Sequence, residues 1–259
     1  MIRPVIVFDF DGVVCDSTDE CLVTSWNAWE RWNGRSGYRA RLEEFTRAER
    51  DAFRPLRPYV AGAGAYYVLR RCLEENLPIH AQADFDRYCQ DWQANLEAFK
   101  RLFYQERERL RAANLSAWLD LHPVWPEVVE AISRFGREGR AYIATLKDGE
   151  SVRLILQAHG ATLAAERILD QSRIASKLEA LEMIRTAEGC PAGDVVFLDD
   201  NATHLLGPAR AGFVCYLAGW GNTLAEHVEM ARQGGIPVIG LEQVLTMASG
   251  EDAAAAAPR

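Results

Sequence analysis

The stretch "VIVFDFDGVVCDS" at residues 5–17 joins a run of apolar residues to two closely spaced carboxylates. Its first four residues are typical of a strand that is buried on both faces in the middle of a parallel sheet. In an extended chain, residues two positions apart point to the same side, so Asp9 and Asp11 converge where the strand ends. Two carboxylates that are desolvated together repel and raise each other's pKa values. The stretch therefore predicts a bound cation, or a shared proton, at this point.

The composition is that of a globular protein with one large domain or two smaller ones. The chain has 259 residues, of which 49% are hydrophobic and 25% are charged. Its net charge of −8 argues against general binding to nucleic acid or to an anionic membrane surface. No apolar run approaches the roughly 18 residues that a membrane span needs. We expect a cytoplasmic protein without nucleic-acid or membrane partners, and the sequence gives no indication of its oligomeric state.

Residues 17–118 are predicted to form one helix after another. Apolar and aromatic side chains recur every three or four residues over 84–112, with Asp84 as the expected N-cap and Asn114 just past the end. The Pro- and Gly-rich segment 54–67 predicts a loop between helices. A second helical stripe, which favours packing over ligand binding, consists of Trp26, Trp29 and Trp32.

From about residue 119 the pattern changes to strands that alternate with helices, which predicts a parallel sheet with helices on both faces. The expected strands are 141–145, 195–200, 212–219 and 236–241, and the expected helices are 150–159 and 176–189. A connection between strand and helix normally takes a handful of residues, so the insertion at 17–118 must be a domain of its own. We therefore expect one α/β domain built from 1–16 and 119–250, and a disordered tail at 251–259.

Further polar residues fall at the ends of the expected strands. Thr145 ends one strand, Asp199 and Asp200 end another, and Lys177 opens a helix. The carboxyl ends of neighbouring parallel strands meet at one edge of the sheet, where open α/β sheets bind ligands. We expect these side chains to lie beside the two carboxylates of the opening stretch.

These motifs, in this order, resemble the four motifs of the haloacid dehalogenase superfamily. The matching positions are Asp9-Phe10-Asp11-Gly12-Val13, then Thr145, then Lys177, then Asp199-Asp200. The resemblance extends to the helical insertion only through its position and character, which are similar to those of the family's cap. It implies a Rossmann-like parallel-sheet core with an inserted all-helical cap. It also implies a phosphatase that acts on a small phosphorylated metabolite through an aspartyl-phosphate.

The resemblance implies a role for each core residue. Asp9 looks like the nucleophile and Asp11 like the general acid and base. Thr145 would donate a hydrogen bond to the transferring phosphoryl group, and Lys177 would supply positive charge to it. The implied Mg²⁺ ligands are the carboxylate of Asp9, the main-chain carbonyl of Asp11 and Asp200, with Asp199 as a further direct or indirect ligand.

Other activities within and outside the family stay open. Asp11 favours phosphate esters, because dehalogenase branches of the family lack a carboxylate at that position. A sugar phosphomutase resembling β-phosphoglucomutase would share every core residue named above. A catalytically idle binding protein is a further alternative, whereas response-regulator receivers, with a similar set of side chains, are about half as long and lack the insertion.

Side chains that contact the substrate are harder to predict. The candidates are Arg54, Arg57, Tyr59 and Tyr66 in the loop segment, and Lys147 shortly after the strand-end threonine. Arginines that are simply solvated on a loop explain this segment equally well. The five histidines share no spacing, so surface or packing roles are expected for them.

Overall fold

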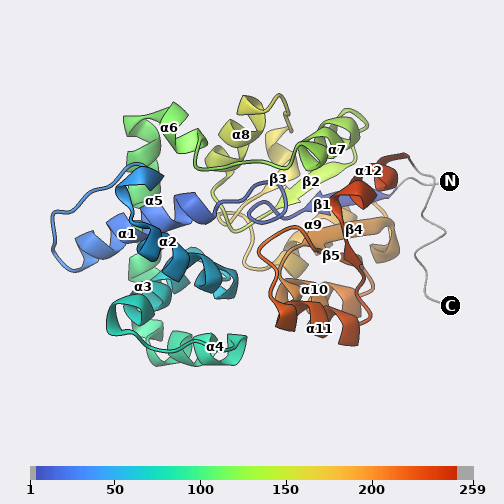
Figure 1. Ribbon diagram of the computed structural model, residues 1–259. Coiled ribbons are helices and arrows are strands. Elements are labelled where there is room, and N and C mark those ends of the chain that lie inside the picture. Colours follow the sequence, from blue (N-terminus) through green and yellow to red (C-terminus); the bar gives the residue numbers. More distant parts are fainter. Residues whose placement is uncertain (1–3, 250–259) are drawn as a thin grey trace. The chain divides into compact units, whose positions relative to one another are not determined.

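The computed structural model describes residues 4–249, so the expected tail at 251–259 lies outside the described residues. A six-stranded parallel sheet has the order β3-β2-β1-β4-β5-β6, and Figure 1 labels β1 to β5. Its strands are β1 (Val5–Phe8), β2 (Ala141–Ala144), β3 (Ile168–Leu169), β4 (Val195–Asp199), β5 (Val214–Ala218) and β6 (Val238–Ile239). The predicted α/β class is confirmed.

Both faces of the central strands are covered, as the apolar opening stretch requires. Val5 and Val7 pack in a buried cluster with side chains of α9, α10 and α11, while Ile6 and Phe8 point to the opposite face and are buried too. The helices that follow the strands are α7 (Pro126–Arg137), α8 (Gly149–Ala158), α9 (Lys177–Glu188), α10 (Ala202–Arg210), α11 (Ala225–Gln233) and α12 (Leu241–Ser249). Short 3₁₀ turns lie at η4 (Ala165–Arg167) and η5 (Ala192–Asp194).

The chain divides into two units, one of which contains the sheet and the other of which is helical. The helical unit spans Ser17–Pro123 and interrupts the sheet unit directly after Asp16. It ends later than the expected residue 118, because Trp118 is buried on the helix that follows α5. Its helices are α1 (Thr18–Trp32), α2 (Arg47–Phe53), α3 (Tyr66–Glu75), α4 (Gln82–Asp91), α5 (Gln93–Ala113) and α6 (Leu115–Leu119), with 3₁₀ turns η1 (Leu42–Glu44), η2 (Arg54–Tyr59) and η3 (Ala63–Ala65).

The single helix expected over 84–112 is wrong, since the chain breaks at Trp92 into α4 and α5. The indole of Trp92 stacks on Tyr88 with ring centroids 5.3 Å apart, and the guanidinium of Arg71 lies 4.3 Å from its centroid. This packing of the aromatic side chains overrides a periodicity that continues through the break. Asp84 does not cap α4, because its carboxylate instead accepts from the backbone N–H of His80.

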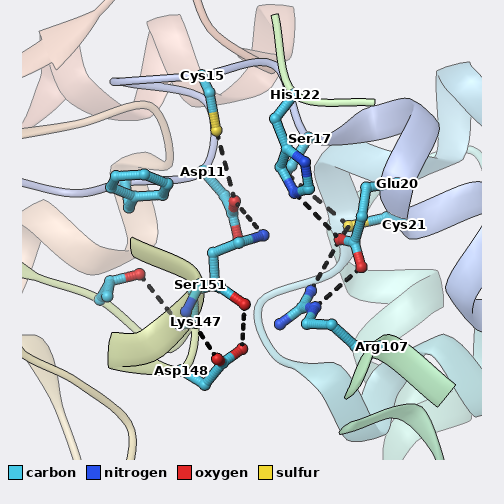
Figure 2. A network of polar contacts seen from close by, with 12 residues as sticks. Asp11, Cys15, Ser17, Glu20, Cys21, Arg107, His122, Lys147, Asp148 and Ser151 are labelled. Carbon is cyan, nitrogen blue, oxygen red and sulfur yellow. Dashed lines mark hydrogen bonds and ion pairs between the residues drawn. The ribbon is translucent and has the colours of Figure 1, made fainter. Parts of the chain in front are cut away.

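The helical unit encloses a buried ion pair, drawn in Figure 2. Arg107 on α5 donates from Nε and Nη2 to the two carboxylate oxygens of Glu20 on α1, both at 2.9 Å. Thr24 donates to the same carboxylate at 2.6 Å. Glu20 is 0% exposed and Arg107 is 4% exposed. The pair therefore ties α1 to α5 inside the unit.

Within residues 4–249, no helix has the length and apolar character that crossing a membrane requires.

Candidate active site

The register of the sheet brings three strand ends together. Phe8 at the end of β1 is paired with Ile143 of β2 on one side and with Leu198 of β4 on the other. The residues that follow leave the sheet at the same edge, and the backbone N–H of Asp9 donates to the Leu198 carbonyl at 2.8 Å. Adjacent strands thus deliver Asp9, Thr145 and Asp199 to one place, as expected from their positions in the sequence.

Lys177 reaches this edge from the first turn of α9. Its Nζ lies 2.5 Å from Asp9 Oδ1 and 3.5 Å from Asp199 Oδ2, and it donates to the Ala144 carbonyl at 2.6 Å. Ser176 caps α9 by accepting from a backbone N–H of its first turn, which fixes where the helix begins. The ammonium is 5% exposed and sits between two strand-end carboxylates.

Burial and charge set the protonation of this cluster. Burial raises the pKa of Asp9 from 3.8 to about 6, with Lys177 opposing the rise and Asp199 adding to it. Burial also lowers the pKa of Lys177, but the nearby carboxylates outweigh that effect and hold it above its usual value. Asp9 is therefore a carboxylate whose negative charge its neighbours only partly compensate.

Asp200 lies against the backbone of the opening stretch. Its Oδ2 accepts from the Asn222 N–H at 2.8 Å. Gly12 has φ +85°, and a Cβ built there would lie 1.7 Å from Asp200 Oδ2. A glycine is needed here for two reasons, since the backbone is left-handed and the carboxylate occupies the space of a side chain. Asp200 is thereby held beside the peptide that joins Asp11 to Gly12.

Asp11 has a lysine partner within the same unit. Lys147 Nζ lies 3.1 Å from Asp11 Oδ1, and the contact can be followed in Figure 2. The backbone N–H of Lys147 donates to the hydroxyl of Thr145 at 3.1 Å, so one short turn after β2 positions both side chains. Lys147 is 1% exposed. It belongs to the group of charged side chains at this edge.

His204 was not expected at the site, yet it contacts one of the strand-end carboxylates. Its Nδ1 lies 3.2 and 3.1 Å from the two oxygens of Asp199. Burial lowers the pKa of His204, but Asp199 raises it more, so the pKa lies above its usual value. The sequence signal was weak: α10 starts just after the two aspartates, and a first-turn side chain can reach back to them.

The sequence comparison agrees with this geometry. The family model of the haloacid dehalogenase-like hydrolases matches residues 4–212, which is most of the chain. The chain belongs to this family. No curated protein sequence matches it.

Solved structures of this family share the fold. A predicted phosphoglycolate phosphatase from Haemophilus somnus 129PT has a TM-score of 0.60 at 17% identity, covering 95% of this chain and 99% of its own. A hydrolase from Pseudomonas syringae has a TM-score of 0.61 at 13% identity, with 96% and 99% covered. CbbY from Rhodobacter sphaeroides, in complex with phosphate, has a TM-score of 0.57 at 20% identity, with 94% and 99% covered. At these identities the likeness shows the fold alone.

The site of this haloacid dehalogenase-like hydrolase fits a small divalent cation. Ligand atoms of Asp9, Asp199 and His204 lie within 4.8 Å of one another. The two lysines of the edge offset two of its four carboxylates, and a divalent cation would offset the other two. The carboxylate oxygens of this set are donors that Mg²⁺ prefers, whereas the His204 nitrogen is not. Burial, with a smaller contribution from Asp199, raises the pKa of Asp9, and a bound cation would oppose that rise.

The four candidates of the loop segment lie in the helical unit. Arg54 forms an ion pair with Asp19 at 2.9 Å, and the side chain of Arg57 is largely buried. Tyr59 stacks on a phenylalanine of α4. Tyr66 is 3% exposed and stacks on two further phenylalanines, which makes its ring part of the helical core. The segment itself folds into η2, η3 and the start of α3 rather than a simple loop.

Proposed function

We propose that this protein is a Mg²⁺-dependent phosphatase that hydrolyses a small phosphorylated metabolite, with Asp9 as the nucleophile. The observation that carries the proposal is the buried Asp9 carboxylate, 2.5 Å from Lys177 Nζ and beside Asp199. A phosphate monoester is itself negative, so an attacking carboxylate needs charge compensation and alignment more than intrinsic reactivity. Family membership and the phosphatase descriptions of several structural neighbours support hydrolysis.

The two carboxylate oxygens of Asp9 have different roles: one accepts hydrogen bonds that orient the group, and the other attacks the substrate. Its Oδ1 accepts from the Phe10 N–H at 2.6 Å and from Lys177, which orients the group. Its Oδ2 attacks phosphorus, the bond from phosphorus to the ester oxygen breaks, and an aspartyl-phosphate forms. The hydroxyl of Thr145 and the ammonium of Lys177 hold the transferring oxygens. Water then attacks phosphorus and releases inorganic phosphate and the free carboxylate.

Asp11 moves the protons. In the first half-reaction its carboxyl group protonates the leaving oxygen, and in the second the resulting carboxylate takes a proton from the attacking water. The sum is one ester plus one water giving one alcohol plus one phosphate. The contact with Lys147 supports a fixed position for Asp11 in the sheet unit.

The cation would be held by the carboxylates of Asp9 and Asp200 and by the main-chain carbonyl of Asp11, with Asp199 close by. When bound, it supplies positive charge to the phosphoryl oxygens and to the crowded carboxylates. The packing of Asp200 against Gly12 supports this ligand set, because it brings the carboxylate next to the Asp11 peptide.

We further propose that the helical unit is a cap over a catalytic core built from the sheet unit. Arg54, Arg57, Tyr59, Tyr66 and Lys147 stay predictions as residues that contact the substrate. A cap that closes over its site suits a small metabolite and excludes bulk water.

The experiment is a phosphatase assay on purified protein with 4-nitrophenyl phosphate and a panel of phosphorylated metabolites, with and without Mg²⁺. Release of phosphate should require Mg²⁺ and disappear with Asp9→Asn or a chelator. Asp194→Asn is the matched control, because Asp194 lies just before β4, at the opposite edge of the sheet. Failure to hydrolyse any compound would contradict the proposal, and isomerisation of a sugar phosphate would favour the mutase instead.

A further inference from the structure

Asp199 is fully buried and is contacted from α10 on both of its carboxylate oxygens. Its side chain is 0% exposed. Its Oδ1 accepts from the Asn201 N–H at 2.8 Å, and both of its oxygens lie within 3.2 Å of His204 Nδ1. Burial would raise the pKa of Asp199, but His204 and Lys177 together hold it below its usual value. The group is therefore a fully enclosed carboxylate whose orientation is fixed from the α10 side.

With its hydrogen on Nδ1, His204 can donate to the Asp199 carboxylate, whose two oxygens lie 3.2 and 3.1 Å away. That hydrogen is present in the imidazolium and in one of the two neutral tautomers. The contact therefore does not depend on the charge of His204. His204 lies in the first turn of α10. The next residue, Leu205, is buried in the core of the sheet unit and fixes this turn of the helix.

The contact continues across the carboxylate to the catalytic lysine. Lys177 Nζ lies 3.5 Å from Asp199 Oδ2 and 2.5 Å from Asp9 Oδ1. If the Asp199 carboxylate rotated away, the Lys177 ammonium would lose this contact and keep those with Asp9 and the Ala144 carbonyl. One of these three polar contacts of the ammonium thus depends on the orientation of Asp199, and the other two are with Asp9 and the Ala144 carbonyl.

We propose that His204 is a positioning residue: by donating its Nδ1–H to Asp199, it fixes the carboxylate that holds Lys177 against Asp9. The inference rests on the proposed function for its kinetic consequence, whereas the placement of Lys177 can be measured without turnover. His204 acts through Asp199 and Lys177 and contacts no substrate.

Two substitutions separate the hydrogen bond from the bulk of the ring. His204→Asn keeps an N–H donor near the position of Nδ1, and His204→Leu removes the donor while filling the space. A hydrogen bond to a charged group is strong enough that its loss should lower kcat roughly tenfold or more in His204→Leu. We expect KM to change little and His204→Asn to retain most of the wild-type kcat.

His227 provides a matched control in the same unit. It is 0% exposed, and in the part of the chain that the structure describes neither ring nitrogen has a hydrogen-bond partner. His227→Leu removes a second buried imidazole, one that lies near Asp199 and His204 but makes no hydrogen bond to Asp199, and should leave kcat close to wild type. Melting temperatures confirm that all variants are folded.

The decisive measurement is the side-chain NMR signal of Lys177. The sequence has only three lysines, at positions 100, 147 and 177, so lysine labelled with ¹⁵N gives at most three ammonium signals, assigned by Lys177→Arg. The Lys177 signal should shift or broaden in His204→Leu and stay in place in His204→Asn and His227→Leu. Equal spectra and equal kcat for all three variants would overturn the inference.

A second outcome would also overturn it. A nitrogen coupling to bound Mn²⁺, seen by pulsed electron paramagnetic resonance in the wild type and lost in His204→Leu, would make His204 a metal ligand instead. If the wild type hydrolyses no phosphate ester, the proposed function fails, but the NMR comparison still decides whether His204 positions Lys177.

Discussion

Burial of Asp9 raises its pKa from 3.8 to about 6, although Lys177 lies 2.5 Å away. A pKa that is higher in the folded than in the unfolded state means that the folded protein binds the proton more tightly. The stability that this gives is fully present below pH 3.8 and is lost as the pH rises through 6. In the metal-free protein, the ionised carboxylate is therefore a destabilising group at neutral pH.

Asp9→Asn should consequently stabilise the metal-free protein at pH 8. A difference of about two pKa units corresponds to about 3 kcal/mol, a value that already includes the opposing attraction of Lys177. The gain should vanish near pH 4, where the wild-type carboxyl group is protonated. Urea denaturation at both pH values measures it. A loss of stability at pH 8, or an equal gain at both, would contradict the assignment.

Gly12→Ala should weaken binding of a divalent cation. The added Cβ would meet Asp200 Oδ2 at 1.7 Å, so the carboxylate has to move away from the Asp11 peptide. The left-handed backbone adds about 1–2 kcal/mol of strain. Mn²⁺ affinity, measured from the free-ion resonance signal, should fall at least about tenfold, equivalent to about 1.4 kcal/mol.

Gly160→Ala isolates the backbone contribution. Gly160 has φ +76°, and a Cβ there would meet nothing within 4 Å. It should cost only the backbone strain and leave the Mn²⁺ affinity unchanged. Equal affinities for the two variants would show that Asp200 does not hold the ion.

Sequence position alone is enough to expect the strand-end residues at one edge of the sheet, because an apolar strand fixes where the residues after it emerge. Asp9, Thr145 and Asp199 needed only neighbouring strands to meet. His204 could not be predicted in this way, because its contact depends on how α10 leaves β4. A lone histidine in a first turn has no periodicity that marks it.

Helix α9 has an N-cap at Ser176, and the next residue is Lys177 of the candidate site. Ser176 accepts from the Glu179 N–H, and Glu179 accepts in return from the Ala175 N–H. Ser176→Ala should cost about 1 kcal/mol of stability, as is usual for N-caps. Because the first residue of the helix is Lys177, kcat should fall as well.

Thr46→Ala is the control for this prediction. Thr46 caps α2 of the helical unit in a similar way: its hydroxyl accepts from the Glu49 N–H, and Glu49 accepts from the N–H of Thr46 itself. It should cost similar stability and leave kcat with 4-nitrophenyl phosphate near wild type. Melting temperatures are recorded for both variants. If both variants lower kcat equally, the N-cap of α9 has no specific effect on catalysis.

Element boundaries followed from the sequence where the pattern was strong and local. The strand at 195–200 and the helix at 176–189 were confirmed within a residue or two. The two-residue strand β3 is too short to show alternation, and it was missed. The break between α4 and α5 was missed for another reason: it depends on the packing of Trp92 against residues far along the chain.

At the scale of the whole molecule, the helical unit depends on the buried pair of Glu20 and Arg107. Arg107→Met leaves a buried carboxylate without its guanidinium, which should cost about 3–5 kcal/mol. Glu20→Met combined with Arg107→Met should recover most of that loss, because apolar side chains of similar size replace both charges. Urea denaturation of the two single variants and the double variant measures the coupling; additive losses would mean that the pair is not coupled.

The two-unit organisation was expected from one feature, an insertion too long for a connection. The residues of the helical unit that meet a substrate could not be derived in the same way. Aromatic side chains such as Tyr66 follow the pattern of a ligand-binding loop in sequence and yet stack inside the helical core.

The central claim is that Asp9 becomes phosphorylated during turnover. The most direct test is an acid quench of the protein turning over ³²P-labelled 4-nitrophenyl phosphate with Mg²⁺, followed by peptide mapping. We predict hydroxylamine-labile label on the peptide that contains Asp9, absent from Asp9→Asn. Sustained hydrolysis with no label, or with label on another residue, would contradict the account.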